Sequence, residues 1–292
     1  MRVLLATDGT KDAQAAAAFL KHLPLPPSTT LRITAVAAHL DSTLDMPPAG
    51  EFKRAALDEA RGIAEAARAR LAPLGFAIET DVGVGDPRSE IIRIADEWAA
   101  DLVVLGARGM GRVKRFLLGS VSLAVARHAS CSVLVVKGRP RKLDSVLVAM
   151  DGSEDSFRAV RFLESLALSQ PTRVRLLSVV ERLRQPTTAP LAVRGHIVRV
   201  LKELDAERRG ELDKVLERAA AELDDKITRV TRSTSTGNPA DVIVATAQST
   251  DTDLVVVGAR GLGGLSRLLL GSVSENVLRH ARCPVLIVKA PR

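Results

Sequence analysis

The sequence has almost no aromatic residues: it contains six phenylalanines, one tryptophan and no tyrosine among 292 residues. A hydrophobic core must therefore be built from Leu, Val, Ile and Ala, and few side chains are available for stacking the bases of single-stranded nucleic acid. Cysteine is equally scarce, since Cys131 and Cys283 are the only two, and neither belongs to a CxxC pair or to a cluster of other metal ligands. This pattern favours small core or interface residues over a metal site.

Long hydrophobic runs are absent as well. No uninterrupted apolar stretch approaches the roughly 18 residues of a membrane span, and Asp8 comes too early for the core of a signal peptide. Hydrophobic residues make up 46% and charged residues 26% of the chain, as in a soluble globular protein. We therefore expect a cytoplasmic protein with no membrane partner.

The motifs of common catalytic chemistries are also missing. The sequence has no GxxxxGK[ST] loop and hence no Walker lysine. No spacing suggests a set of Ser, His and Asp, and no residue stands out as a catalytic base. His128 and His280 each lie near the end of a predicted helix, where a cation complements the helix dipole. We therefore assign no catalytic and no metal-ligating residue.

The net charge of +8 is the one global property that suggests a nucleic-acid partner. Most basic residues alternate with acids, however, as in residues 198–218, which is typical of a solvated helix face. A denser basic group, Arg108, Arg112, Lys114 and Arg115, lies inside a glycine-containing loop and could serve phosphate oxygens directly. Nucleic acid is therefore not an expected partner.

What the sequence does contain is a duplication. The segment GARGMGRVKRFLLGSVS at residues 106–122 returns as GARGLGGLSRLLLGSVS at residues 258–274. Around these segments, VLLATD at 3–8 returns as VLVAMD at 146–151, and VLVVK at 133–137 returns as VLIVK at 285–289. The chain length suits two domains of about 150 residues each. We predict domains at residues 1–140 and 141–292, called here the first and second copy.

The two copies differ in length. Their offset is 143 residues at Asp8 and 152 residues from Gly85 onward, so the second copy holds nine extra residues. We place them within residues 182–195, a stretch rich in Pro and Thr.

Short apolar runs alternate with longer helical patterns in both copies. The first copy is predicted to contain strand 2–6, helix 12–22, strand 31–37, helix 51–71, strand 76–82, helix 89–99, strand 102–105, helix 120–128 and strand 133–136. Such alternation favours an α/β fold with a parallel sheet covered on both faces.

The glycine segments begin after the fourth strand and end at the start of a helix, where free backbone N–H groups and the helix dipole favour anions. Their glycines allow the backbone to approach phosphate oxygens and to adopt positive φ, and their serines can donate hydrogen bonds. Asp8 and Asp151 end the first strands, which in a doubly wound sheet lie beside the fourth strands. We interpret these acids as contacts to a ribose or base. The alternative is that each acid caps the following helix, and both roles can coexist.

On these residues, both copies resemble the universal stress protein family in its tandem-domain, nucleotide-binding branch. The resemblance covers almost the whole chain and is carried by the Gly-x2-Gly-x9-Gly-Ser spacing and the acid ending strand one. It implies two tandem doubly wound, five-stranded parallel sheets of order 3-2-1-4-5, a Rossmann-like fold of the adenine nucleotide alpha hydrolase type. It also implies ATP, alone or with Mg²⁺, in the crevice of each sheet.

The resemblance further implies roles for individual residues. The phosphate-binding set comprises Gly106, Gly109, Gly119, Ser120 and Ser122, with Gly258, Gly261, Gly271, Ser272 and Ser274 in the second copy. The remaining pairs are the acids near the nucleoside, Asp8 and Asp151, the positions whose backbone meets adenine, Val36 and Val179, and the arginines that could reach phosphate, Arg108 and Arg260.

The two copies do not match the family pattern equally. The usual Glu-Asn after the helix-opening serine is present at residues 275–276 but is Leu-Ala at 123–124, and the usual Pro before strand five is Pro284 but Ser132 in the first copy. We therefore expect unequal occupancy, with the second copy favoured. The resemblance also suggests that the two fifth strands pair within the chain, and that two such chains form a dimer.

The leading hypothesis is a stress-response regulator that binds ATP in one or both copies. The alternatives are a slow ATP hydrolase and an interaction module with a vestigial nucleotide pocket.

Overall fold

The computed structural model describes residues 1–37, 49–109, 118–138, 142–166, 168, 172–181, 191–223, 229–262 and 270–290. The first copy contains β1 (Arg2–Ala6), α1 (Lys11–Leu20), β2 (Thr30–Ala37), α2 (Ala49–Leu71), the 3₁₀ helix η1 (Ala72–Leu74), β3 (Ala77–Val84), α3 (Pro87–Glu97), β4 (Leu102–Gly106), α4 (Ser120–His128) and β5 (Ser132–Val136). The second copy contains β6 (Ser145–Met150), α5 (Glu154–Ser165), β7 (Arg173–Val180), α6 (Leu191–Leu223), β8 (Arg229–Thr236), α7 (Pro239–Ser249), β9 (Leu254–Gly258), α8 (Ser272–His280) and β10 (Val285–Val288). The predicted alternation of strand and helix is confirmed.

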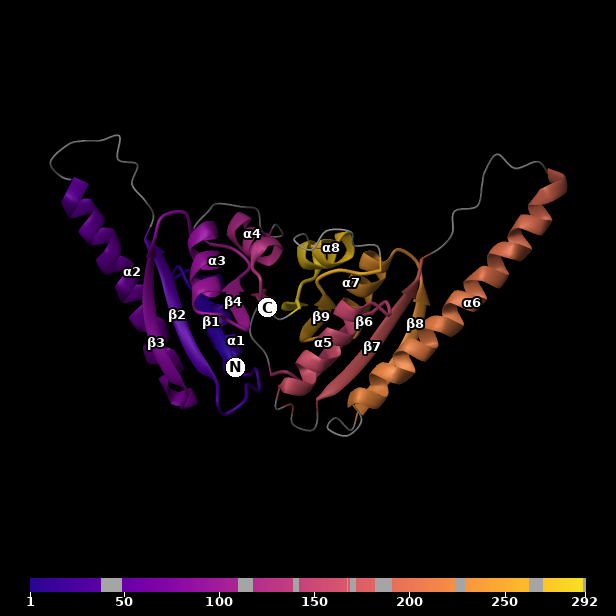
Figure 1. Cartoon of the computed structure of the whole chain (residues 1–292), viewed down its shortest axis with the longest axis horizontal. Helices are drawn as coiled ribbons and strands as arrows, with labels where there is room; N and C mark the ends of the chain where they lie inside the picture. Colours follow the sequence, from indigo (N-terminus) through magenta and orange to yellow (C-terminus); the bar gives the residue numbers. More distant parts are fainter. Residues whose placement is uncertain are drawn as a thin grey trace.

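The strands form one continuous ten-stranded sheet in the order β3-β2-β1-β4-β5-β10-β9-β6-β7-β8. Within each copy neighbouring strands are parallel, and the order 3-2-1-4-5 that the sequence suggested is confirmed. The copies meet where β5 and β10 pair antiparallel, with Leu134 opposite Leu286. Figure 1 shows the copies side by side, with α2 and α6 on the outer flanks and α4 and α8 near the junction.

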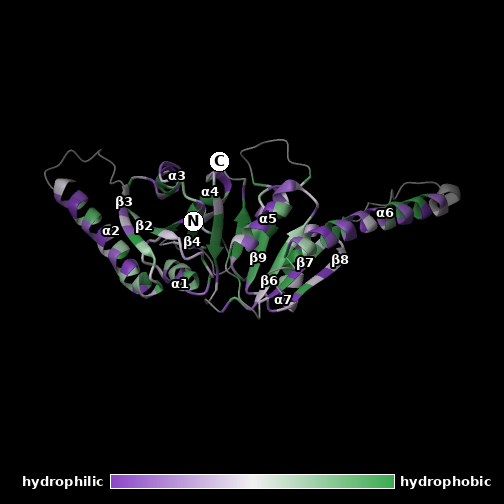
Figure 2. Ribbon diagram, turned by 60° about the horizontal axis from the view of Figure 1, so that its bottom comes forward, coloured by the Kyte–Doolittle hydropathy of each residue, from purple (hydrophilic) through white to green (hydrophobic). Residues whose placement is uncertain are grey.

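Helices cover both faces of the sheet, so its strands are apolar on both sides. Val3 and Leu5 of β1 belong to the core that includes residues of α1 and α2, whereas Leu4 and Ala6 belong to the core that includes residues of α3 and α4. The second copy contributes to the same two cores through its own helices. Figure 2 shows the hydrophobic strands at the centre and the mixed polarity of α2 and α6. The continuous Leu, Val, Ile and Ala runs thus supply the core that the scarcity of aromatics required.

The extra length of the second copy lies between β7 and the body of α6. Helix α6 has 33 residues and α2 has 23. Their last residues, Leu223 and Leu71, are 152 positions apart, which is the offset between the copies from Gly85 onward, so the two helices end at equivalent positions. The additional turns are therefore at the amino end of α6, which extends beyond the sheet in Figure 1. The predicted location at 182–195 includes the start of this helix, while residues 182–190 lie outside the described part of the chain.

Two lysines hold the copies together at the β5–β10 junction. Lys137 donates hydrogen bonds to the carbonyls of Leu278 and Ala281 at the end of α8. Lys289 reaches in the opposite direction, to the carbonyl of Ala129 just after α4. Burial lowers the pKa of each lysine to about 8, because desolvation disfavours the charged amine.

None of the helices in the described ranges is long and apolar enough to cross a membrane.

Candidate functional site

Each copy has a cavity at the carboxyl ends of its central strands, the usual ligand position in a doubly wound sheet. The first cavity has a volume of about 280 Å³ and the second about 450 Å³. All eight predicted residues of the first copy line the first cavity: Asp8, Val36, Gly106, Arg108, Gly109, Gly119, Ser120 and Ser122. All eight of the second copy line the second: Asp151, Val179, Gly258, Arg260, Gly261, Gly271, Ser272 and Ser274. The fold therefore brings each set together at one place.

The acids at the ends of the first strands do not cap the following helices. Helix α1 is capped by Thr10, whose Oγ1 accepts a hydrogen bond from Ala13 N at 3.4 Å. Asp8 Oδ1 instead accepts from Thr10, with distances of 3.1 Å to its N and 2.6 Å to its Oγ1. The alternative role of Asp8 as the helix cap is wrong, because the cap lies two residues later.

The second copy repeats this arrangement. Ser153 caps α5, donates its hydroxyl to Asp151 Oδ1 at 2.6 Å, and accepts from Ser156 N at 3.2 Å. The other carboxylate oxygen of Asp151 accepts a hydrogen bond from Leu262 N at 3.2 Å, directly after Gly261. The acid thus contacts the glycine loop and is held toward the cavity.

The short distance between the acid and the loop explains why the second loop position is glycine in both copies. A Cβ atom on Gly109 would lie 2.6 Å from Asp8 Oδ2, and one on Gly261 would collide with Asp151 Oδ2 in the same way. The first glycine has a different neighbour, since a Cβ on Gly106 would lie 2.5 Å from the backbone carbon of Asp12 in the first turn of α1. The acid and the loop approach each other only because the loop residue is glycine.

The expectation that these glycines supply positive φ is wrong. Gly119 and Gly271 cap α4 and α8 with φ values of −68° and −65°. Within the described ranges, the glycines with positive φ are Gly9, Gly75, Gly85, Gly138, Gly152 and Gly237, and none of the six motif glycines is among them. The motif requires glycine for space rather than for backbone conformation.

The two serines of each motif have different environments. Ser122 and Ser274 are buried, and their hydroxyls donate to Ala107 O at 2.7 Å and to Gly258 O at 2.6 Å. They attach the start of the loop to the following helix. Ser120 and Ser272 are exposed as the first residues of α4 and α8 and line the cavities, and the first backbone N–H groups of a helix have no partner within it.

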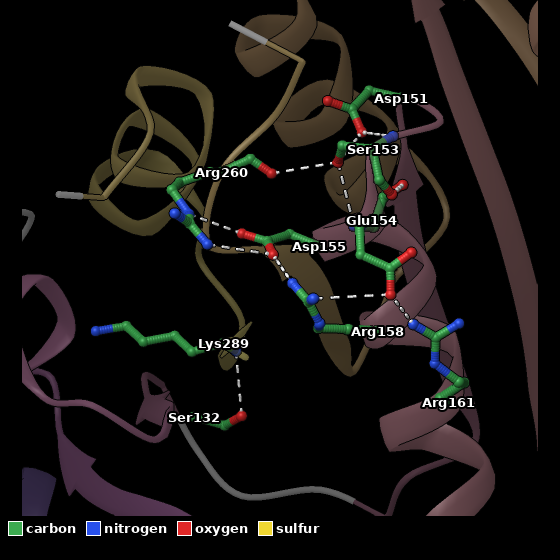
Figure 3. A network of polar contacts seen from close by, with 10 residues as sticks. Ser132, Asp151, Ser153, Glu154, Asp155, Arg158, Arg161, Arg260 and Lys289 are labelled. Carbon is green, nitrogen blue, oxygen red and sulfur yellow. Dashed lines mark hydrogen bonds and ion pairs between the residues drawn. The ribbon is translucent and has the colours of Figure 1, made fainter. Parts of the chain in front are cut away.

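The loop arginines form ion pairs that the sequence analysis missed. Arg108 Nε lies 2.7 Å from Asp12 Oδ2, and Arg260 Nε lies 3.0 Å from Asp155 Oδ2. Figure 3 shows the second pair beside Ser153 and Asp151. The hydrogen bond to Asp12 raises the pKa of Arg108, so the guanidinium stays charged. One signal could have revealed these partners: an aspartate follows the strand-one acid by four residues in both copies.

The denser basic group proposed from sequence is incomplete in the described structure. Arg112, Lys114 and Arg115 lie outside the described residues, and only Arg108 of that group is placed. Among the described residues there is also no group of three or more His, Cys, Asp and Glu side chains that could hold a metal ion.

With this geometry in place, comparison with known proteins decides the family. The sequence model of the Universal stress protein family matches residues 1–137 and again residues 142–289. The chain belongs to the universal stress protein family.

The chain is similar to several known universal stress proteins. A universal stress protein of Mycobacterium tuberculosis is 31% identical over 226 residues, which are 73% of this chain and 70% of that protein. A solved universal stress protein of Archaeoglobus fulgidus matches 99% of this chain and 98% of its own, with 21% identity and a TM-score of 0.66. A universal stress protein solved in complex with cAMP is 26% identical, covering 50% of this chain and 97% of that one, with a TM-score of 0.32.

The two copies of this universal stress protein differ beside their cavities. Glu275, in the first turn of α8, accepts hydrogen bonds from Arg127 of α4 at 2.7 Å and from Arg279 of its own helix at 2.8 Å. Desolvation alone would raise the pKa of Glu275, but the two arginines outweigh it and the net shift is downward. The matching position in the first copy is Leu123. Leu123 cannot form the symmetric counterpart of the pair between Arg127 and Glu275.

Proposed function

We propose that the chain is a stress-response regulator that binds ATP, alone or with Mg²⁺, in one or both cavities. The observation that carries the proposal is the convergence of all eight predicted residues of each copy on a single cavity. They come from three strand ends and a helix start that are far apart in the sequence.

The lining of each cavity combines two kinds of chemistry. It includes the amino terminus of α4 or α8, where the helix dipole and free N–H groups favour the negative charge of phosphates. It also includes apolar side chains, Val36 and Ile91 in the first copy and Val179 and Ile243 in the second. A ligand with a flat, weakly polar ring and an anionic tail suits this arrangement, and ATP is such a ligand.

The larger second cavity is expected to fill first. Its volume of about 450 Å³ lies within the range of about 300–1,000 Å³ usual for small-molecule sites. The first cavity, at about 280 Å³, is below that range. This difference supports the unequal occupancy suggested by the closer family pattern of the second copy.

The experiment is to denature the purified protein, identify the nucleotide released, and count it per chain, with calorimetric titration of ATP as a second measure. Ser120→Asp and Ser272→Asp each place a carboxylate at the first residue of α4 or α8. An acid there suits the helix dipole but repels phosphate, so each variant is expected to fold and to lose binding at one cavity. Ser89→Asp, an exposed position in the first turn of α3 that does not line the cavity, is the matched charge control.

We expect the wild type to release ATP. Ser272→Asp should release less ATP per chain, whereas Ser89→Asp should release as much as the wild type. Recovery of ADP in place of ATP would favour the slow hydrolase. Absence of nucleotide after purification, together with no ATP binding by calorimetry, would overturn the proposal and favour the interaction module.

A further inference from the structure

The linings of the two cavities match at most positions. Sixteen lining positions correspond between the copies, and four of them carry different residues: Thr7 and Met150, Ala13 and Ser156, Thr34 and Leu177, and Leu105 and Val257. At two of these positions the second copy replaces a threonine with an apolar residue. Thr7 Oγ1 accepts a hydrogen bond from Gly9 N at 3.3 Å, so Thr34 is the threonine whose hydroxyl needs an explanation.

Thr34 has an unusual environment for a threonine. It lies on β2 opposite Ala6 of β1, and strand alternation places it on the same face as Val36, toward α3. Thr34 is fully buried, and its Oγ1 has no hydrogen-bond partner among the residues that the structure describes. The backbone is satisfied, since Thr34 O accepts from Thr7 N at 2.9 Å. The hydroxyl alone is left without a partner, at the wall of the first cavity.

A buried hydroxyl without a hydrogen bond costs free energy, and such groups are rare in folded proteins. Leu177 shows that the fold does not need a hydroxyl at this position, because it is buried in the core at 1% exposure. The unsatisfied group therefore points to a partner that arrives with the ligand. Thr34 lies two residues before Val36 on β2, and Val36 is the position whose backbone the family resemblance places against adenine.

We propose that Thr34 determines the ligand preference of the first cavity by hydrogen bonding to the edge of a bound nucleotide's base, whereas Leu177 gives the second cavity only apolar contact. This inference rests on the proposed nucleotide binding. The two cavities of one chain then differ in chemistry as well as in volume. The first selects for a base with a hydrogen-bonding group at its inner edge, and the second tolerates its absence.

The test uses the full chain with ATP as the probe. In a Ser272→Asp background, which leaves the first cavity as the ATP site, Thr34→Val removes the hydroxyl but keeps the shape, and Thr34→Ser keeps the hydroxyl. Loss of one neutral hydrogen bond is expected to weaken ATP binding by about three- to tenfold in Thr34→Val, with a smaller effect in Thr34→Ser. In a Ser120→Asp background, Leu177→Thr is expected to make the second cavity sensitive to the base in the same manner.

A second measurement separates ligand recognition from a structural role. Without nucleotide, Thr34→Val is expected to raise the melting temperature, because it removes an unsatisfied buried hydroxyl. Thr29→Val is the matched control: Thr29 is also buried, but its hydroxyl donates to Pro26 O at 2.6 Å and does not line the cavity. That variant should melt at a lower temperature and bind ATP as the parent does.

Unchanged ATP affinity in Thr34→Val, with normal binding by its parent, overturns this inference and leaves the proposed function intact. A lower melting temperature for nucleotide-free Thr34→Val also overturns it, since the hydroxyl would then have a partner in the protein. Absence of ATP binding by the wild type overturns the inference and the proposed function together.

Discussion

At the scale of single residues, the glycines of each loop serve two separate purposes. Gly106 leaves room for the first turn of α1, because a Cβ there would meet backbone atoms of Asp12 and Ala13. Gly109 leaves room for the carboxylate of Asp8, which is the end of a side chain and can move. The same division holds for Gly258 in the second copy, where the neighbours are again backbone atoms. One glycine is needed for packing and the next for the position of an acid.

This division predicts different effects for two alanine substitutions. Gly106→Ala should lower the free energy of unfolding by about 1–3 kcal/mol, as overpacking against backbone does. Gly109→Ala should change stability less and should weaken ATP binding at the first cavity by displacing Asp8. Urea unfolding and calorimetry in the Ser272→Asp background measure the two effects. Equal loss of stability in both variants would contradict the division.

At the scale of secondary structure, short polar side chains fix the helix starts beside the cavities. Thr10 and Ser153 cap α1 and α5 and at the same time hold Asp8 and Asp151. The start of each helix and the orientation of the acid therefore depend on one hydroxyl. The residue two positions after the acid therefore determines both where the helix begins and how the acid is oriented.

Ser153→Ala should reduce the free energy of unfolding by about 1 kcal/mol, since loss of a helix cap costs about 0.5–2 kcal/mol. Ser165→Ala is the control, because Ser165 is an exposed residue at the other end of the same helix. Urea unfolding of both variants provides the comparison. Equal stability of the two variants would show that Asp151 replaces Ser153 as the cap.

Much of the secondary structure could be predicted from sequence. The helix at 120–128 and most strand positions agree with the structure, because continuous apolar runs bounded by glycine and polar residues indicate buried strands. Residues 198–218 were interpreted as a solvated helix face, and they lie within α6. The first residues of this helix, 191–197, were not anticipated as helical.

At the scale of the whole molecule, the two copies form one sheet whose outer edges are β3 and β8. Both edge strands carry charged or hydroxyl side chains, such as Glu79 and Arg232, which disfavour further strand addition. The inner edge strands, β5 and β10, pair with each other. Lys137 and Lys289 bridge that junction in opposite directions.

The buried junction predicts a rise in stability between pH 8 and pH 9. Lys137 and Lys289 have folded pKa values of about 8, below the ordinary 10.5, so above pH 8 the unfolded chain binds more protons and the free energy of unfolding increases with pH. Burial raises the pKa of Cys131 and Cys283 to about 11 from 9.0, which has the opposite sign and acts mainly above pH 9. The net gain from pH 8 to 9 should be about 1 kcal/mol.

Urea unfolding at intervals across pH 7.5–9 measures this gain. The control is the double variant Lys137→Met with Lys289→Met, which lacks both amines and should show no rise. A wild-type stability that falls between pH 8 and 9 would contradict the prediction.

The sequence by itself determined the duplication, the alternation of strand and helix, the family, and sixteen of the residues that line the two cavities. These features are local or periodic, and spacing along the chain reports them directly. The tertiary structure decided which side chains meet across the fold: Arg108 with Asp12, Arg127 with Glu275, and the Thr34 hydroxyl with no partner in the described part of the chain. Such contacts join residues roughly a hundred or more positions apart, or depend on the absence of a neighbour. They exist only once hydrophobic burial has brought the strands into one sheet.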